Sequence, residues 1–204
     1  MFRIISADGS IKEISASGLE DLPELMKKVE KDYIPLDQVI NDIRIDGETI
    51  EGSGSDDWPL IPLSVITDIE ITSDYPHRIA LRGMKQSIQL LNESKQVLLE
   101  TAESFKSNRL SEAQNGLIQG ITALESFVRF LSVVRPFFQD SIGQFDLYQN
   151  KLLTVLEDLL LKQKDQNWNA LADALLNDLL PQMESWKEIV NSIVQNEGNS
   201  APPA

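Results

Sequence analysis

Hydrophobic positions along the chain change their spacing near residue 75. Before that point, apolar and polar residues alternate in short runs, which is typical of β-strands. After it, apolar residues recur every three or four positions over long stretches, which predicts helices. The pattern therefore predicts an α+β protein, with a small mixed domain at 1–74, a helical domain at 75–197 and a disordered tail at 198–204.

The first domain contains the signals of a sheet with one helix. Strands are expected at 2–7 and 11–15, around Asp8-Gly9, a dipeptide that favours a tight hairpin turn. A helix of about three turns follows and ends before Pro35, because proline disfavours the helical state in the preceding residue. Further strands are expected at 39–45, 48–51 and 66–72, with a turn at Asp46-Gly47 and a polar, flexible loop at 52–57.

This order of elements resembles the β-grasp fold of ubiquitin-like domains over residues 1–72. The resemblance includes Tyr33-Ile34-Pro35-Leu36-Asp37 after the helix and the turn and strand at 44–50. It implies a β-grasp domain that acts as a docking module, or one that only caps the helical domain. Modifiers and sulfur carriers of this kind end in a free Gly-Gly tail. Here the last strand continues through Thr72-Ser73-Asp74 into a helix, so the resemblance does not extend to conjugation or sulfur transfer.

The second domain is predicted to contain four long helices. The first three end near Ser107, Val134 and Lys164, and the fourth begins at Trp168, with Asp165 as its expected cap. Arg135-Pro136 ends the second helix, and Pro181 should bend the fourth. Because the connections are short and the apolar stripes wide, we expect an antiparallel four-helix bundle closed by one chain.

The second of these helices carries a stripe that is small at one end and bulky at the other. Its small residues are Ala113, Gly116, Gly120 and Ala123. A glycine inside a helix costs about 1 kcal/mol relative to alanine, so a compensating contact is expected. One interpretation is the close approach of a neighbouring helix of the same chain. The other is a groove that accepts a helix from a partner.

A basic cluster stands at the junction of the two domains. It consists of His77, Arg78, Arg82 and Lys85, and it follows directly after the acidic first domain. We expect these residues to dock against the acidic residues of that domain and to limit hinge motion at 73–76.

The charge distribution narrows the class of partner. The formal net charge is −14, of which −11 lies in residues 1–76 and −3 in residues 77–204. Nucleic acids and anionic membranes attract the opposite sign, so neither is an expected partner. A basic protein surface is an allowed partner, and a solvated acidic face is the other interpretation. No signal peptide and no apolar run near the roughly 20 residues of a membrane span is apparent, so we expect a cytoplasmic protein.

Few residue types for catalysis or metal binding are present. The chain has no cysteine and a single histidine, His77, which excludes thiolate sites and most catalytic triads. Segment 116–120 lacks the Lys-Ser/Thr ending of a phosphate loop. Glu157 with Asp158, and Asp173 with Asp178, are paired only by proximity along a helix. We therefore expect no catalytic residue, no metal site and no cofactor.

The function expected from these features is protein binding without catalysis. The first hypothesis is an adaptor or chaperone-like protein that binds a helix or a basic surface. In general character it resembles export chaperones of bacterial secretion and flagellar assembly. The second hypothesis is a structural subunit whose bundle forms a homodimer. The third is a bundle that binds a small ligand in an internal cavity.

Overall fold

The computed structural model describes residues 2–50, 58–138 and 142–200. The chain is an α+β protein that forms two compact units, which divide between Ile79 and Ala80. This boundary lies a few residues after the expected one at 74. Arg78 belongs to the first unit because it bonds back to it: Nη1 donates to the carbonyl oxygen of Ala7 at 3.2 Å, and Nε lies 3.4 Å from Asp74 Oδ1. Each unit is described by itself below.

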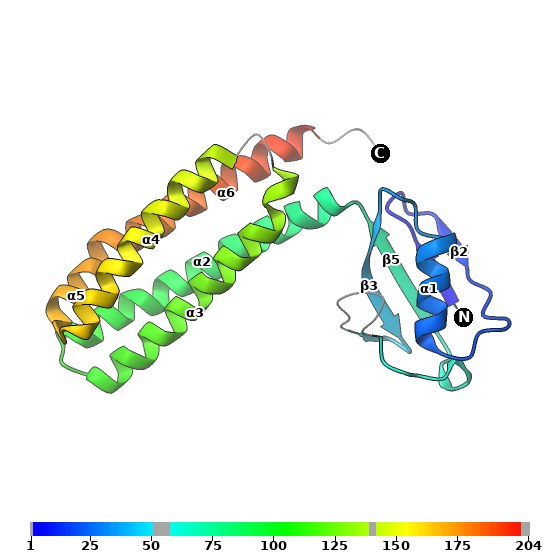
Figure 1. The fold of residues 1–204 in the computed structure, drawn as a ribbon, viewed down its shortest axis with the longest axis horizontal. Helices are drawn as coiled ribbons and strands as arrows, with labels where there is room; N and C mark the ends of the chain where they lie inside the picture. Colours follow the sequence, from blue (N-terminus) through cyan, green and yellow to red (C-terminus); the bar gives the residue numbers. More distant parts are fainter. Residues whose placement is uncertain (1, 51–57, 139–141, 201–204) are drawn as a thin grey trace. The chain divides into compact units, whose positions relative to one another are not determined.

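The first unit contains a five-stranded mixed sheet with one helix on it (Figure 1). Its strands are β1 (Phe2–Ile5), β2 (Ile11–Glu13), β3 (Val39–Ile45), β4 (Glu48–Thr49) and β5 (Ile69–Asp74). They lie in the order β2-β1-β5-β3-β4, with β1 and β5 parallel and the other pairs antiparallel. The central pair joins the first and last strands of the unit, so the sheet requires the whole of this segment.

Helix α1 (Leu22–Asp32) covers the apolar face of the sheet. Asp21 caps its first turn by accepting the Glu24 amide N–H at 3.0 Å, and the Glu24 carboxylate accepts the Glu20 amide N–H at 2.9 Å. This reciprocal pair satisfies backbone donors that have no partner inside the helix. The buried side chains of the helix pack on isoleucines of the central strands; the helix contributes Leu22, Leu25, Met26 and Val29.

Several strand ends differ from the sequence prediction, and β1, β2 and β4 each end two residues earlier than expected. The turn at Asp46-Gly47 forms as expected, with φ of 50° and 89°. However, β5 begins at Ile69 rather than at 66, because the amide N–H groups of Thr67 and Asp68 donate to Asp46 Oδ1 at 3.0 and 2.7 Å. A short 3₁₀ helix, η1 (Leu63–Val65), precedes them. The expected flexible loop at 52–57 lies outside the described residues.

The second unit is helical. Its elements are α2 (Pro76–Lys106, which begins in the first unit), α3 (Leu110–Val134), the 3₁₀ turn η2 (Arg135–Phe137), α4 (Ile142–Lys164), α5 (Trp168–Ala174), the π-helical segment η4 (Leu175–Leu179) and α6 (Leu180–Ser200). Helices α2, α3 and α4 correspond to the first three predicted helices. The fourth is divided into α5, η4 and α6.

Proline accounts for two of the differences from the predicted helices. Pro136 lies in η2, which directly follows α3, and α4 begins only at Ile142, several residues after the proline that was expected to separate the two helices. Pro181 follows η4, whose wider turns move the carbonyl groups away from the proline ring. The wider turns also keep the buried residues on one side of the helix. Leu171, Leu175, Leu179 and Met183 are each four residues apart, so on an ideal α-helix with 3.6 residues per turn they would rotate around the axis.

The ends of the last helices also differ from the prediction. Asn167, not Asp165, caps α5, and its Oδ1 accepts the Ala170 amide N–H at 3.2 Å. Helix α6 continues to Ser200, so the expected disordered tail does not begin at 198, and residues 201–204 lie outside the described part.

Helix α3 is more apolar than we expected from its sequence. By length and composition alone, one helix among the described residues could cross a membrane, at Leu110–Phe137, with a mean hydropathy of 1.5 over an 18-residue window. The expectation that no apolar segment approaches this length was therefore too strict. Only 33% of that window is buried inside the chain, so much of this apolar helix is accessible.

Candidate functional site

The stripe of small residues on α3 faces α2 of the same chain. A Cβ atom at Gly120 would lie 2.6 Å from Leu98 Cγ, and one at Gly116 would overlap Thr101 Oγ1. Ala113 is fully buried, and Ala123 is partly buried. The geometry supports the interpretation of close helix approach. A partner helix at Ala113, Gly116, Gly120 and Ala123 stays a prediction, but it would have to displace α2 at the two glycines.

Helix α6 links the two helices on either side of it through an aromatic cluster. The buried Trp186 ring lies edge-on to Phe127 of α3, with centroids 5.6 Å apart, and stacks on Phe145 of α4 at 6.0 Å. Tyr148 of α4 meets the same indole at 6.0 Å. One indole of α6 therefore packs against aromatic side chains of both α3 and α4.

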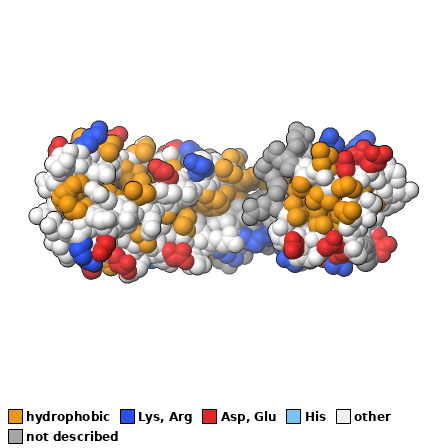
Figure 2. Space-filling model, turned by 90° about the horizontal axis from the view of Figure 1, so that it is seen from below, with side chains coloured by type: hydrophobic (Ala, Val, Ile, Leu, Met, Phe, Trp, Pro, Cys, Tyr) orange, Lys and Arg blue, Asp and Glu red, His pale blue; other side chains and the backbone are white. Residues whose placement is uncertain are grey.

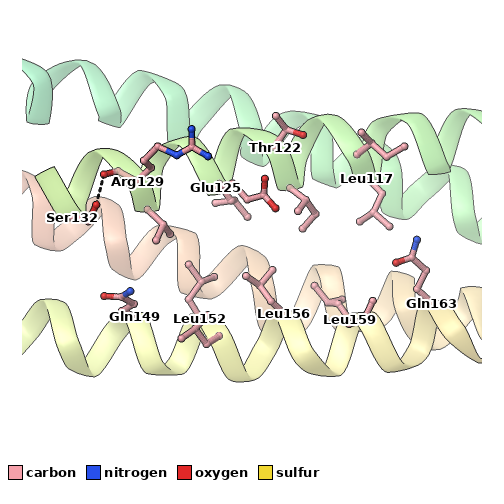
Figure 3. A pocket seen from close by; sticks show the side chains of 16 residues that line it. Leu117, Thr122, Glu125, Arg129, Ser132, Gln149, Leu152, Leu156, Leu159 and Gln163 are labelled. Carbon is pink, nitrogen blue, oxygen red and sulfur yellow. Dashed lines mark hydrogen bonds between the residues drawn. The ribbon is translucent and has the colours of Figure 1, made fainter. Parts of the chain in front are cut away.

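An open groove lies between α3 and α4, with a volume of about 950 Å³ (Figure 3). Ten of its sixteen lining side chains are apolar. From α3 they are Leu117, Ile118, Ile121, Leu124 and Val128, and from α4 they are Leu152, Leu153, Leu156, Leu159 and Leu160. None of the four small residues of α3 lines it. The expected closure of the bundle by one chain is therefore incomplete along this side.

The walls of the groove have the spacing of coiled-coil seams. On α4, the positions Gln149, Leu153, Leu156, Leu160 and Gln163 follow each other in steps of four and three. On α3, steps of three and four join Ile118, Ile121, Glu125, Val128 and Ser132. In a coiled coil, such seams receive the side chains of another helix. With a rise of 1.5 Å per residue, each wall is about 21 Å long, the length of roughly four helical turns.

Several apolar side chains of the walls are solvent-exposed in the single chain. Ile118 is 64% exposed, and Leu153 and Leu160 are each 49% exposed. In Figure 2, apolar side chains reach the surface at several places on the helical part. Burying a leucine or isoleucine stabilises a protein by about 1.5–3 kcal/mol relative to exposure, so covering the groove would be favourable.

The polar rim of the groove carries one acid and one base among its described lining residues, Glu125 and Arg129. Both side chains are exposed, and neither forms an ion pair with another described residue. Thr122, Ser132, Gln149 and Gln163 complete the rim. The rim therefore offers hydrogen bonds and two opposite charges around an apolar centre.

Lys95 interrupts the apolar seam of α2. Its side chain lies at the edge of the core and forms an ion pair with a carboxylate of α6. Its Nζ donates to Glu184 Oε1 of α6 at 2.6 Å, and Lys187 Nζ lies 2.7 Å from Glu184 Oε2. Lys187 first, and Lys95 second, hold the pKa of the Glu184 carboxyl below its usual value of 4.5. This arrangement joins α2 to α6 and has no sign of a ligand site.

One carboxylate of each acidic pair considered for chemistry takes part in an ordinary ion pair. Asp158 pairs with Lys162 one turn along α4, and Asp173 Oδ1 lies 2.8 Å from Lys106 Nζ of α2. Among the described residues, no group of three His, Asp or Glu side chains could hold a metal ion.

A smaller, polar hollow of about 340 Å³ lies at the end of the helices, where Trp168 stacks on Phe105 with centroids 5.4 Å apart.

The basic residues at the domain junction fall on both sides of the boundary. His77 and Arg78 belong to the first unit, and Arg82 and Lys85 belong to α2 of the second. Within the first unit, the Asp74 carboxylate accepts the Tyr75 amide N–H at 2.8 Å and neighbours Arg78. Docking of the four residues against the acidic domain stays a prediction.

Sequence reasoning missed the groove, although two features of the sequence relate to it. The first is the alternation of four- and three-residue steps on α4, a spacing that also fits a wide apolar stripe facing a core. The second is the low charge of α3, where Glu125 and Arg129 are the only charged residues from Ala113 to Val134. Neither feature reveals which helices meet and which stay apart.

Comparison with known proteins gives one match. No curated protein and no solved structure matches this chain. A family model described as a domain of unknown function (DUF8042) matches residues 83–189, a segment that includes all the residues of the groove. Because this match spans more than half of the sequence, the chain belongs to the DUF8042 family.

Proposed function

We propose that this protein is a non-enzymatic protein-binding module whose α3–α4 groove holds an amphipathic helix. The observation that carries the proposal is the pair of facing, heptad-spaced seams that line an open groove and that none of the described helices covers. A helix of about four turns matches the length of the walls. Its apolar side would meet the leucines, and its polar side would meet the rim.

The shape of the site favours a helix over a small ligand. The hollow is long, and its apolar residues recur at the spacing that receives knobs from a helix. A small-molecule site would instead need polar groups that converge on one point. The polar lining residues are spread along the rim, which favours an adaptor or chaperone-like role and fits the cytoplasmic location proposed from the sequence.

Finer assignments of the fold accompany this proposal. The parallel central strands, the helix on one face and the order of elements support a β-grasp assignment for the first unit. The antiparallel course of α2 and α3 supports a four-helix-bundle assignment for the second, with α5, η4 and α6 acting together as its fourth member. In this assignment, the groove is the open side of the bundle.

A binding assay with a defined peptide tests the proposal. The probe is a fluorescent, designed peptide of about four helical turns with leucines at the a and d positions. We expect saturable binding to the full chain by fluorescence anisotropy. Leu160→Asp should weaken this binding at least about tenfold, because it places a charge against the apolar side of the peptide.

Leu161→Asp is the matched control, because Leu161 is 60% exposed on the same helix and does not line the groove. We expect this variant to bind like the natural chain. Equal effects of the two substitutions, or no saturable binding of the peptide, would contradict the proposed groove. Circular dichroism of both variants checks that the helices remain folded.

A further inference from the structure

The outer face of α3, beside the groove, has unusually few charges for an accessible helix. From Ala113 to Val134 it carries only Glu125 and Arg129, while Ile118 and Val133 are 64% and 66% exposed. Accessible helix faces normally carry many charged residues, and the centres of protein interfaces are depleted of them. This face therefore has the composition of an interface that the single chain does not bury.

The sequence of this face is complementary to itself in the reverse direction. About a point at Phe127, residues at equal distances along α3 fall into matched pairs: Glu125 with Arg129, Thr122 with Ser132, and Ile121 with Val133. Ile118 is matched in the same way by Pro136 of η2. These residues, apart from Ile121 at the groove edge, are exposed. A pattern of opposite charges and like polarities is what a two-fold symmetric contact requires.

We infer that the occupant of the groove is a second copy of this chain, bound through antiparallel α3 helices about a two-fold axis near Phe127. The inference depends on the proposed function, because it names the helix that the groove holds. In each protomer, α3 of the partner lies between α3 and α4 and covers Leu153 and Leu160. Glu125 of each copy pairs with Arg129 of the other.

The position of the axis agrees with the extent of the groove. Lining residues of α3 run from Leu117 to Ser132, and Phe127 lies within one helical turn of the middle of that wall, towards its Ser132 end. A partner α3 centred there would contact the wall along its length. The same contact accounts for the apolar character of α3, because its outer face would be buried between protomers instead of in a membrane.

The first test measures the mass of the assembly and asks whether it depends on the charges at positions 125 and 129. Sedimentation of the full chain at micromolar concentrations should give twice its mass of 22.9 kDa. Glu125→Arg alone, or Arg129→Glu alone, replaces both attractions by repulsions and should weaken dimerisation by roughly tenfold or more. The double variant, which exchanges the two charges, should restore the dimer.

A mixture of the two single variants is the sharper test of symmetry. One chain then carries two arginines and the other two glutamates at 125 and 129, so both contacts of the heterodimer are attractive. Native mass spectrometry should show the heterodimer in excess over either homodimer. Glu103→Arg on the exposed side of α2 is the control, and it should leave the dimer unchanged.

Three results would overturn the inference. They are a monomer at all concentrations, a dimer insensitive to the charge exchange, and a monomer that instead sediments with phosphatidylcholine vesicles. A monomer that still binds the leucine peptide through Leu160 would overturn the homodimer but leave the proposed function intact. If the inference is right, the peptide competes with the second copy, so its apparent affinity falls as the protein concentration rises.

Discussion

Leu98 of α2 lies directly over Gly120 of α3, in the space that a side chain at position 120 would need. Thr101 lies over Gly116 in the same way, and Phe130 of α3 lies over Gly83 of α2, 2.7 Å from an added Cβ atom. As residue numbers rise along α2, those of the contacts on α3 fall, so the two helices are antiparallel. The glycines thus let the backbone of each helix approach side chains of the other.

Gly120→Ala should destabilise the protein despite the better helix propensity of alanine. The added methyl group overlaps Leu98, and overpacking costs about 1–3 kcal/mol against a propensity gain of about 1 kcal/mol. Gly143→Ala on α4 is the control, because no atom lies within 4 Å of its added Cβ. It should leave stability unchanged or raise it. Urea unfolding of both variants measures the difference, and an increase in stability for Gly120→Ala would contradict the close contact.

Gln166→Gly should stabilise the turn between α4 and α5. Gln166 has a φ of 54°, in the left-handed region that glycine adopts more easily, and its N–H bonds to the Gln163 carbonyl at 3.1 Å. We expect a gain of about 0.5–1 kcal/mol in thermal unfolding. Asp165→Gly, one residue earlier and without a positive φ, should lower stability. Equal effects of the two substitutions would contradict the described turn.

Trp186→Phe should cost much less stability than Trp186→Ala. The indole N–H of Trp186 is buried without a hydrogen-bond partner among the described residues, so removing it relieves a desolvation cost of about 1–3 kcal/mol. That gain offsets part of the lost ring volume, whereas alanine should cost about 3–5 kcal/mol. Guanidinium unfolding measures both variants. A phenylalanine variant as unstable as the alanine variant would show that the indole N–H has a partner.

Glu184→Gln should lower stability at neutral pH and lose its effect in acid. The lowered pKa of Glu184 means that its ionised form stabilises the folded state above the usual pKa of 4.5. That contribution disappears as the pH falls through the lowered value. Because the pair is partly exposed, we expect roughly 0.2–1 kcal/mol at pH 7. Urea unfolding of this variant and of the exposed control Glu188→Gln, from pH 7 downward, tests the difference.

The sequence by itself determined the class and most elements of this protein. Apolar spacing placed α2, α3 and α4 to within a few residues at most ends, and Asp46-Gly47 identified a turn with two positive φ values. These features are local, because they depend on residues a few positions apart in the chain. The same local reasoning placed the start of β5 too early, since the side chain of Asp46, about twenty residues away, binds the backbone there.

Only the tertiary structure decided which apolar faces are buried and which remain open. Helical spacing gave α3 one wide apolar arc. In the structure, Leu98 and Thr101 of α2 lie against its glycines, whereas another part of the arc lines the open groove. A stripe of leucines looks the same in a sequence whether a neighbour covers it or not. The difference depends on which side chains meet from distant parts of the chain, and residues a few positions apart do not encode those meetings.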